Sequence, residues 1–177
     1  MPVFTVIDHE DFTGTTSSWN KDTIPDSYDH LLLCMSTRAS NSGVYTANGK
    51  LYINGDDSGT TYSETQLYAS ATNPDSYQGA NLATSLYSYY PTAASCLGST
   101  HSATEVWFPH YSQSDNYKTW ISKCIAPNNS TTDSQWIVNT AAGIWENTNA
   151  IDELGAAVFG GSFVIDSTFT LYGVTGV

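Results

Sequence analysis

Positive charge is the scarcest property of this sequence. The 177 residues include 5 Lys and Arg against 17 Asp and Glu, which gives a formal net charge of −12. A protein that binds nucleic acid by counterion release needs a run of cations to neutralise phosphates, and an anionic membrane surface repels an acidic chain. We therefore expect neither nucleic acid nor a membrane among the partners of this protein.

Long apolar runs are missing as well. A membrane-spanning helix needs about 20 consecutive apolar residues, and no stretch of the sequence approaches that length. The first residues, from Met1 to Thr5, contain neither the basic region nor the apolar core of a signal peptide. We expect a chain that is made in the cytoplasm without a signal peptide.

Cysteine is sparse, with three residues that lie far apart in the sequence, Cys34, Cys96 and Cys124. An odd number of widely spaced cysteines does not indicate a disulfide framework. Cys34 lies in an apolar run, where a small buried hydrophobic side chain is the expected role. Because no Cys or His pair has the spacing of zinc ligands, we expect no metal and no cofactor.

The turn that begins at Asn54 is the one segment that suggests calcium. Asn54, Asp56 and Asp57 place three oxygen-bearing side chains close together, but the spacing of an EF-hand loop is absent. A turn whose Asn and Asp side chains bond its own backbone is the favoured interpretation. A calcium site at these residues stays open as the alternative.

Catalytic patterns are also lacking. Gly160-Gly161-Ser162 does not have the strand, turn and helix setting of a nucleophile elbow. A glycosidase needs two carboxylates about 5 to 10 Å apart, whereas the glutamates of this chain are scattered singly. Solvated surface carboxylates are the default in an acidic protein. We expect that the protein is not an enzyme and has no catalytic residue.

The residues that are abundant favour strands. Aromatic residues make up 13% of the chain, and twelve of them are Tyr, a composition typical of β structure. Asn48-Gly49, between two β-prone runs, predicts a tight hairpin turn within residues 44–53. We predict further strands over residues 3–8, 28–37, 62–69, 104–111, 118–126, 136–143, 151–158 and 168–174. The strand at 28–37 is nearly continuously apolar, as in a central strand covered on both faces.

Together these segments predict an all-β fold, an antiparallel, jelly-roll-like β-sandwich of about eight strands, in a single domain over residues 1–177. Two stretches without periodicity, 73–101 and 127–134, predict long exposed connections. The first contains a cluster of tyrosines, which either bind a sugar or protein partner or cover the end of the sandwich. The candidate binding residues are Tyr87, Tyr89, Tyr90 and Trp107.

Several blocks of the sequence resemble, in order, a known family. The run from Ile24 to Leu33 resembles the Ile-Pro-x-x-Tyr-x-x-Leu opening of small β-sandwich structural proteins of tailed bacteriophage virions. The later blocks that agree are Asn54-Gly55-Asp56 with Tyr62-Ser63, Asn116-Tyr117-Lys118-Thr119, and the closing run from Ser167 to Val174. Cys34 stands where the family usually has a basic residue, which removes any contact that a cation makes there.

The resemblance implies a jelly-roll building block of the virion. Its first expected role is a non-enzymatic decoration or cement subunit that binds the major capsid protein or other virion proteins and stabilises the head. The alternative is a tail- or head-fibre module that binds a receptor or a host surface glycan, and an enzyme that degrades surface glycans is a third. Since partner subunits can cover the edges of short antiparallel strands, we expect a homo-oligomer, and similar virion sandwiches favour a trimer.

Overall fold

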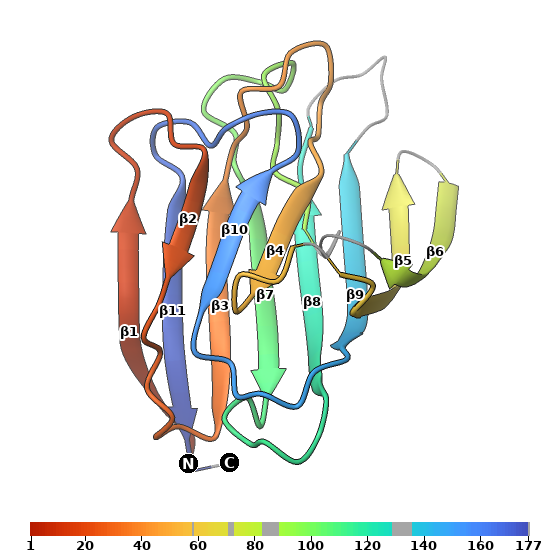
Figure 1. Ribbon diagram of the computed structural model, residues 1–177. Helices are drawn as coiled ribbons and strands as arrows, with labels where there is room; N and C mark the ends of the chain where they lie inside the picture. The colour runs from red at the N-terminus through yellow and green to blue at the C-terminus, as the bar shows by residue number, and fades with distance from the viewer. Residues whose placement is uncertain (58, 71–72, 83–88, 129–135, 177) are drawn as a thin grey trace.

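The computed structural model describes residues 1–57, 59–70, 73–82, 89–128 and 136–176 (Figure 1). Strands and connections make up the described chain, and none of it forms a helix that could span a membrane. The strands are β1 (Val3–Asp11), β2 (Ser18–Lys21), β3 (His30–Thr37), β4 (Gly49–Ile53), β5 (Tyr62–Ser70), β6 (Asn73–Leu82), β7 (Ser102–Pro109), β8 (Lys118–Ala126), β9 (Ile137–Trp145), β10 (Leu154–Val158) and β11 (Thr168–Thr175).

These strands form two antiparallel sheets. The large sheet has eight strands in the order β1-β11-β3-β7-β8-β9-β5-β6, and the small sheet has three in the order β2-β10-β4. The small sheet packs over one face of the large sheet, and β5 and β6 extend beyond β4 at one side (Figure 1). The predicted all-β antiparallel sandwich is confirmed, with more strands than the eight or so expected.

Alternating side chains explain how the large sheet faces the core. In β8, Trp120, Ser122, Cys124 and Ala126 are buried, whereas Ile121 and Ile125 between them are 44% and 52% exposed. Successive residues of a strand point to opposite faces, so every second residue enters the core. We call the face of the large sheet that points to the small sheet the inner face, and the opposite one the outer face.

The core lies between the two sheets. The indole of Trp19 in β2 stacks on the ring of Phe169 in β11, with ring centroids 5.2 Å apart and an angle of 8° between the planes. Leu33 of the large sheet and Leu51 of the small sheet belong to the same buried cluster. Aromatic stacking and apolar burial therefore join the two layers.

The predicted hairpin at Asn48-Gly49 is wrong. β4 begins at Gly49, and a Cβ atom built there would lie 2.3 Å from Cζ of Tyr89. Glycine is therefore needed at this position because the Tyr89 ring packs directly against the backbone, not because the chain turns. The turn with left-handed backbone follows β4, where φ is 53° at Asn54 and 65° at Gly55.

The expected long connection over residues 73–101 is also wrong in its first part, because β6 occupies Asn73–Leu82 and pairs with β5. Residues 74–78 are all exposed, so this part of the edge strand does not alternate between buried and exposed side chains. β2, which buries only Trp19, was not predicted either. Each of the other predicted strands overlaps an observed one.

Strands from opposite ends of the chain lie side by side. β1 pairs with β11, and Val3 is the register partner of Thr175. β11 also pairs with β3, so it lies between β1 and the rest of the large sheet (Figure 1).

Candidate functional site

The outer face of the large sheet contains an apolar row that crosses most of the width of the sheet. One row of directly paired residues crosses six neighbouring strands and consists of Val6, Tyr172, Leu32, Trp107, Ile121 and Ala142. We call these residues the outer-face row. Val6 is 56% exposed and Ile121 is 44% exposed, whereas Leu32, between Tyr172 and Trp107, is almost covered by its neighbours. We expected β3 to be covered on both faces, but no second layer of described residues covers its outer face.

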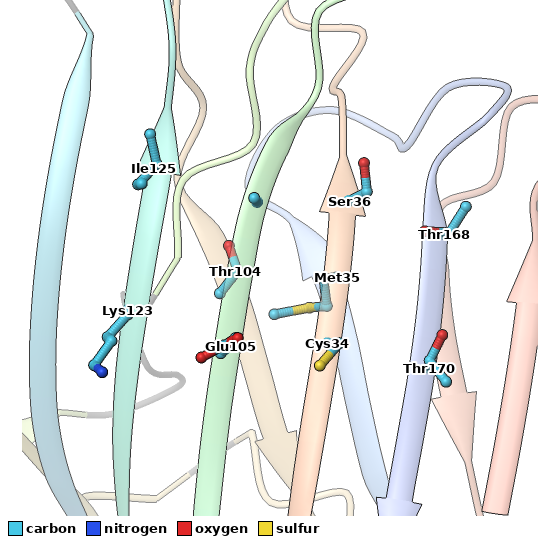
Figure 2. Close-up of a pocket in the computed structure, with 10 residues that line it drawn as sticks. Cys34, Met35, Ser36, Thr104, Glu105, Lys123, Ile125, Thr168 and Thr170 are labelled. Carbon is cyan, nitrogen blue, oxygen red and sulfur yellow. The ribbon is translucent and has the colours of Figure 1, made fainter. Parts of the chain in front are cut away.

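A shallow groove of about 480 Å³ lies next to the outer-face row. Figure 2 looks onto this face, with strands of the small sheet behind. The small side chains Cys34, Ser36 and Ala103 line this groove, together with residues of β8 and β11. Glu105 is the register partner of both Cys34 and Lys123, so one acid and one base lie on neighbouring strands of the groove.

Cys34 does not have the character of a nucleophile. Its side chain is partly buried, and the pKa of the thiol is raised, first by burial and second by the negative charge of Glu105. The thiol, which is the less reactive form, is therefore favoured over the thiolate. Cys34 contributes to the shape of the groove as a small side chain.

The candidate binding tyrosines do not form one surface. Tyr89 is fully buried, and its hydroxyl donates a hydrogen bond to the carbonyl oxygen of Ala157 at 2.7 Å, so its ring belongs to the core. Tyr90 is partly buried and faces the inner side of the large sheet. Trp107 lies on the outer face, with its ring 6.2 Å from that of Phe4. Tyr87 lies outside the described residues.

A second groove, of about 330 Å³, collects aromatic side chains that the sequence did not single out. It lies on the inner face, at the side where β5 and β6 extend beyond the small sheet (Figure 1). We call it the tyrosine groove, and it is lined by Asn48, Gln66, Tyr68, Tyr77 and Tyr90. Only Tyr90 was among the candidates, since Tyr77 lies in the unpredicted strand β6 and its pairing with β5 was not foreseen.

A buried amide, Gln66, forms the floor of the tyrosine groove and is bonded to a buried carboxyl group, Glu64. Gln66 is 1% exposed and Glu64 is 2% exposed. The Tyr90 hydroxyl donates to Oε1 of Gln66 at 2.9 Å, and Nε2 of Gln66 donates to Oε1 of Glu64 at 2.9 Å. Burial, followed by the charge of Glu64, raises the pKa of Tyr90 far above its ordinary value. Tyr90 therefore stays a neutral donor that fixes the orientation of the Gln66 amide.

Two of the three side chains that suggested calcium, those of Asn54 and Asp56, form hydrogen bonds within the protein. Oδ1 of Asn54 accepts a hydrogen bond from the backbone N–H of Asp152 at 3.0 Å, and Nδ2 donates to the carbonyl of Ala150 at 2.7 Å. Oδ2 of Asp56 accepts a hydrogen bond from the indole of Trp145 at 2.8 Å. The described part of the chain contains no group of three or more His, Cys, Asp or Glu residues that could hold a metal ion.

The sequence matches no protein-family model and no curated protein. Among solved structures, the chain is similar to alginate lyase Aly36B. A mutant of that enzyme in complex with an alginate tetrasaccharide has a TM-score of 0.29 and 9% identity, over 99% of this chain and 74% of the lyase chain. Aly36B without a named ligand has a TM-score of 0.28 and 8% identity, over 92% and 73% of the two chains. At these TM-scores the similarity carries no argument about function.

Proposed function

We propose that this protein is a non-enzymatic structural subunit of a tailed-bacteriophage virion and that it decorates and stabilises the head. The ordered sequence blocks support the virion, and the outer face of the large sheet supports a role in assembly. The observation that carries the proposal is the outer-face row, in which apolar residues are paired directly across six strands. An extended apolar patch on a protein surface marks an interaction site.

The outer face is large enough for a stable interface. Eight strands spaced about 4.8 Å apart, with about eight residues each at about 3.3 Å per residue, span roughly 900 Å². A standard protein interface buries about 800 Å² on each partner. Partly exposed aromatic residues, which are enriched in interface cores, lie within this area at Trp107 and Tyr172.

We assign the outer face to other copies of the same chain. Chains with a net charge of −12 repel one another unless they meet where acidic residues are few. The outer-face row contains no charged side chain, and the adjacent groove pairs Glu105 with Lys123. Symmetric packing can therefore place the acid of one copy near the base of the next. The family resemblance favours a trimer.

Immunogold electron microscopy of purified virions tests the proposed location. An antibody to this chain is expected to place gold over the head. Gold confined to the tail or to fibre ends would overturn head decoration in favour of the fibre module. Virions without any gold would overturn the virion assignment altogether.

Sedimentation equilibrium tests the outer face. The unmodified protein is expected to sediment as a multiple of 19.2 kDa. The double variant Ile121→Asp/Ile125→Asp is expected to sediment as a folded monomer, because the two charges added to each outer face repel those of the next copy in a low-dielectric contact. The matched control is Ile165→Asp, at a residue that is 54% exposed in the connection between β10 and β11, and it should leave the oligomer intact. A monomeric unmodified protein, or a double variant that still assembles, contradicts the assignment.

A further inference from the structure

We infer that the tyrosine groove binds a neutral sugar residue of a glycan. Its volume of about 330 Å³ is at the lower end of the range for small-ligand sites, which suits a short stretch of a carbohydrate chain. The groove lies on the inner face, so it stays accessible when other copies cover the outer face. The inference is independent of the proposed role of the outer face.

The aromatic rings of the groove suit the apolar faces of a sugar. Tyr77 is 41% exposed on β6, and Tyr68 is partly exposed on β5. The C–H groups of a pyranose carry partial positive charge, and the face of an aromatic ring carries partial negative charge, so the two attract when they stack. Tyr also provides a large contact area at little cost in conformational entropy.

The polar side chains of the groove suit sugar hydroxyls. Asn48 is an exposed amide of the lining and offers both donors and acceptors, as a hydroxyl does. The buried Gln66 amide is held in place by hydrogen bonds with Tyr90 and Glu64. The floor of the groove therefore does not have to be ordered when a ligand binds, which lowers the entropic cost of binding.

The charge around the groove decides the class of sugar. No Lys or Arg is among the described lining residues. Asp75 is exposed beside the groove, where its Oδ2 accepts a hydrogen bond from the Tyr68 hydroxyl at 3.1 Å. An exposed carboxylate without a cation among the described lining residues repels uronates, sulfated sugars and phosphates. The ligand is therefore an uncharged hexose, not an acidic one.

Saturation-transfer difference NMR on the purified protein tests this inference. The probes are maltose, cellobiose and lactose at millimolar concentration, with glucuronate as the acidic comparison. At least one neutral disaccharide should receive saturation on its C–H protons, and glucuronate should receive none. Tyr77→Ala removes an exposed ring and should weaken binding at least about tenfold, equivalent to about 1.4 kcal/mol.

Two variants separate a lost contact from a lost fold. Tyr117→Ala removes a ring that is 50% exposed, against 41% for Tyr77, from the connection between β7 and β8. This variant should bind like the unmodified protein. Tyr68→Phe keeps the ring but removes the hydroxyl that bonds Asp75, and should retain most of the binding. Circular dichroism should show the same melting temperature for Tyr77→Ala and Tyr117→Ala. The inference is overturned if no neutral disaccharide binds, if Tyr77→Ala binds as well as Tyr117→Ala, or if glucuronate binds as well as the neutral sugars.

Discussion

The indole Nε1 of Trp145 donates a hydrogen bond to Oδ2 of Asp56 at 2.8 Å. The same oxygen accepts a hydrogen bond from the Thr61 hydroxyl at 2.7 Å. Trp145 is 1% exposed, so water cannot replace the carboxylate as its partner. Asp56 therefore ties the turn after β4 to the end of β9.

Replacing Asp56 should destabilise the protein. Asp56→Ala leaves the buried indole N–H without its acceptor, which should lower the free energy of unfolding by about 1 to 3 kcal/mol. Asp56→Asn keeps an acceptor oxygen and should lose less. Urea denaturation measures both values. The control is Asp57→Ala, at an exposed neighbour, which should change the free energy of unfolding by less than about 0.5 kcal/mol. An equal loss in the two alanine variants contradicts this role of Asp56.

Gly49→Ala should be destabilising by about 1 to 3 kcal/mol, because the added methyl group overlaps the buried Tyr89 ring. Its matched control is Gly98→Ala, where a Cβ atom meets nothing within 4 Å. Thermal melting of the two variants checks the difference. If Gly49→Ala melts with the unmodified protein, the close packing of Tyr89 on β4 is refuted.

Stability should fall in alkaline solution. Burial is the largest cause of the raised pKa values of Tyr62, Tyr89 and Tyr90. The unfolded chain releases these protons near the ordinary tyrosine pKa of 10.0, whereas the folded protein retains them. Their contribution is therefore fully present below pH 10 and is lost as the pH rises from there toward the raised values. Burial lowers the pKa of Lys118, and this shift makes stability rise with pH instead of fall. Lys118 is one group, however, and the buried tyrosines that act in the other direction are several.

Thermal melts between about pH 9 and pH 11 measure this alkaline effect. Tyr62→Phe removes one of the buried hydroxyls, so its melting temperature should depend less steeply on pH than that of the unmodified protein. The same slope in both proteins would show that Tyr62 does not contribute.

Alkylation of Cys34 should report on the outer face. Cys34 is partly exposed, whereas Cys96 and Cys124 are buried, so iodoacetamide should label Cys34 first at mildly alkaline pH. Under the proposal that copies of the chain cover the groove, labelling should slow as protein concentration rises. In Ile121→Asp/Ile125→Asp the rate should not depend on concentration. Mass spectrometry of digested samples identifies the labelled residue, and a concentration-independent rate in the unmodified protein speaks against covering of this face.

The strands that sequence could predict are those rich in aromatic and β-branched residues or in continuous apolar residues. β8 was predicted with its observed bounds, although Ser122 is buried and Ile121 is exposed, so the sequence did not show which of its faces enters the core. β6 escaped prediction because its described side chains from 74 to 78 are exposed. The Asn48-Gly49 pair led to the wrong prediction of a hairpin turn. Gly49 is needed there because the Tyr89 ring packs against it, and sequence alone does not distinguish a glycine used for close packing from one used in a turn.

The candidate sites depend on information that only the fold provides. Ile121 and Ile125 are recognisable as apolar residues, but their exposure follows from the small sheet covering the other face. Tyr68 and Tyr77 come together only because β6 pairs with β5. Tyr89 and Tyr90 are adjacent in sequence, yet one is in the core and the other in a groove.

The position of β11 between β1 and β3 determines when the large sheet can be completed during synthesis. β1 is made before β11, yet its only partner among the described strands is β11, which begins at Thr168. Long-range pairing of this kind slows folding, so β1 stays unpaired until β11 has been made. A product that stops before Thr168 therefore loses two strands instead of one, since β1 then has no partner to dock on, and the outer-face row is broken at Tyr172 and Val6.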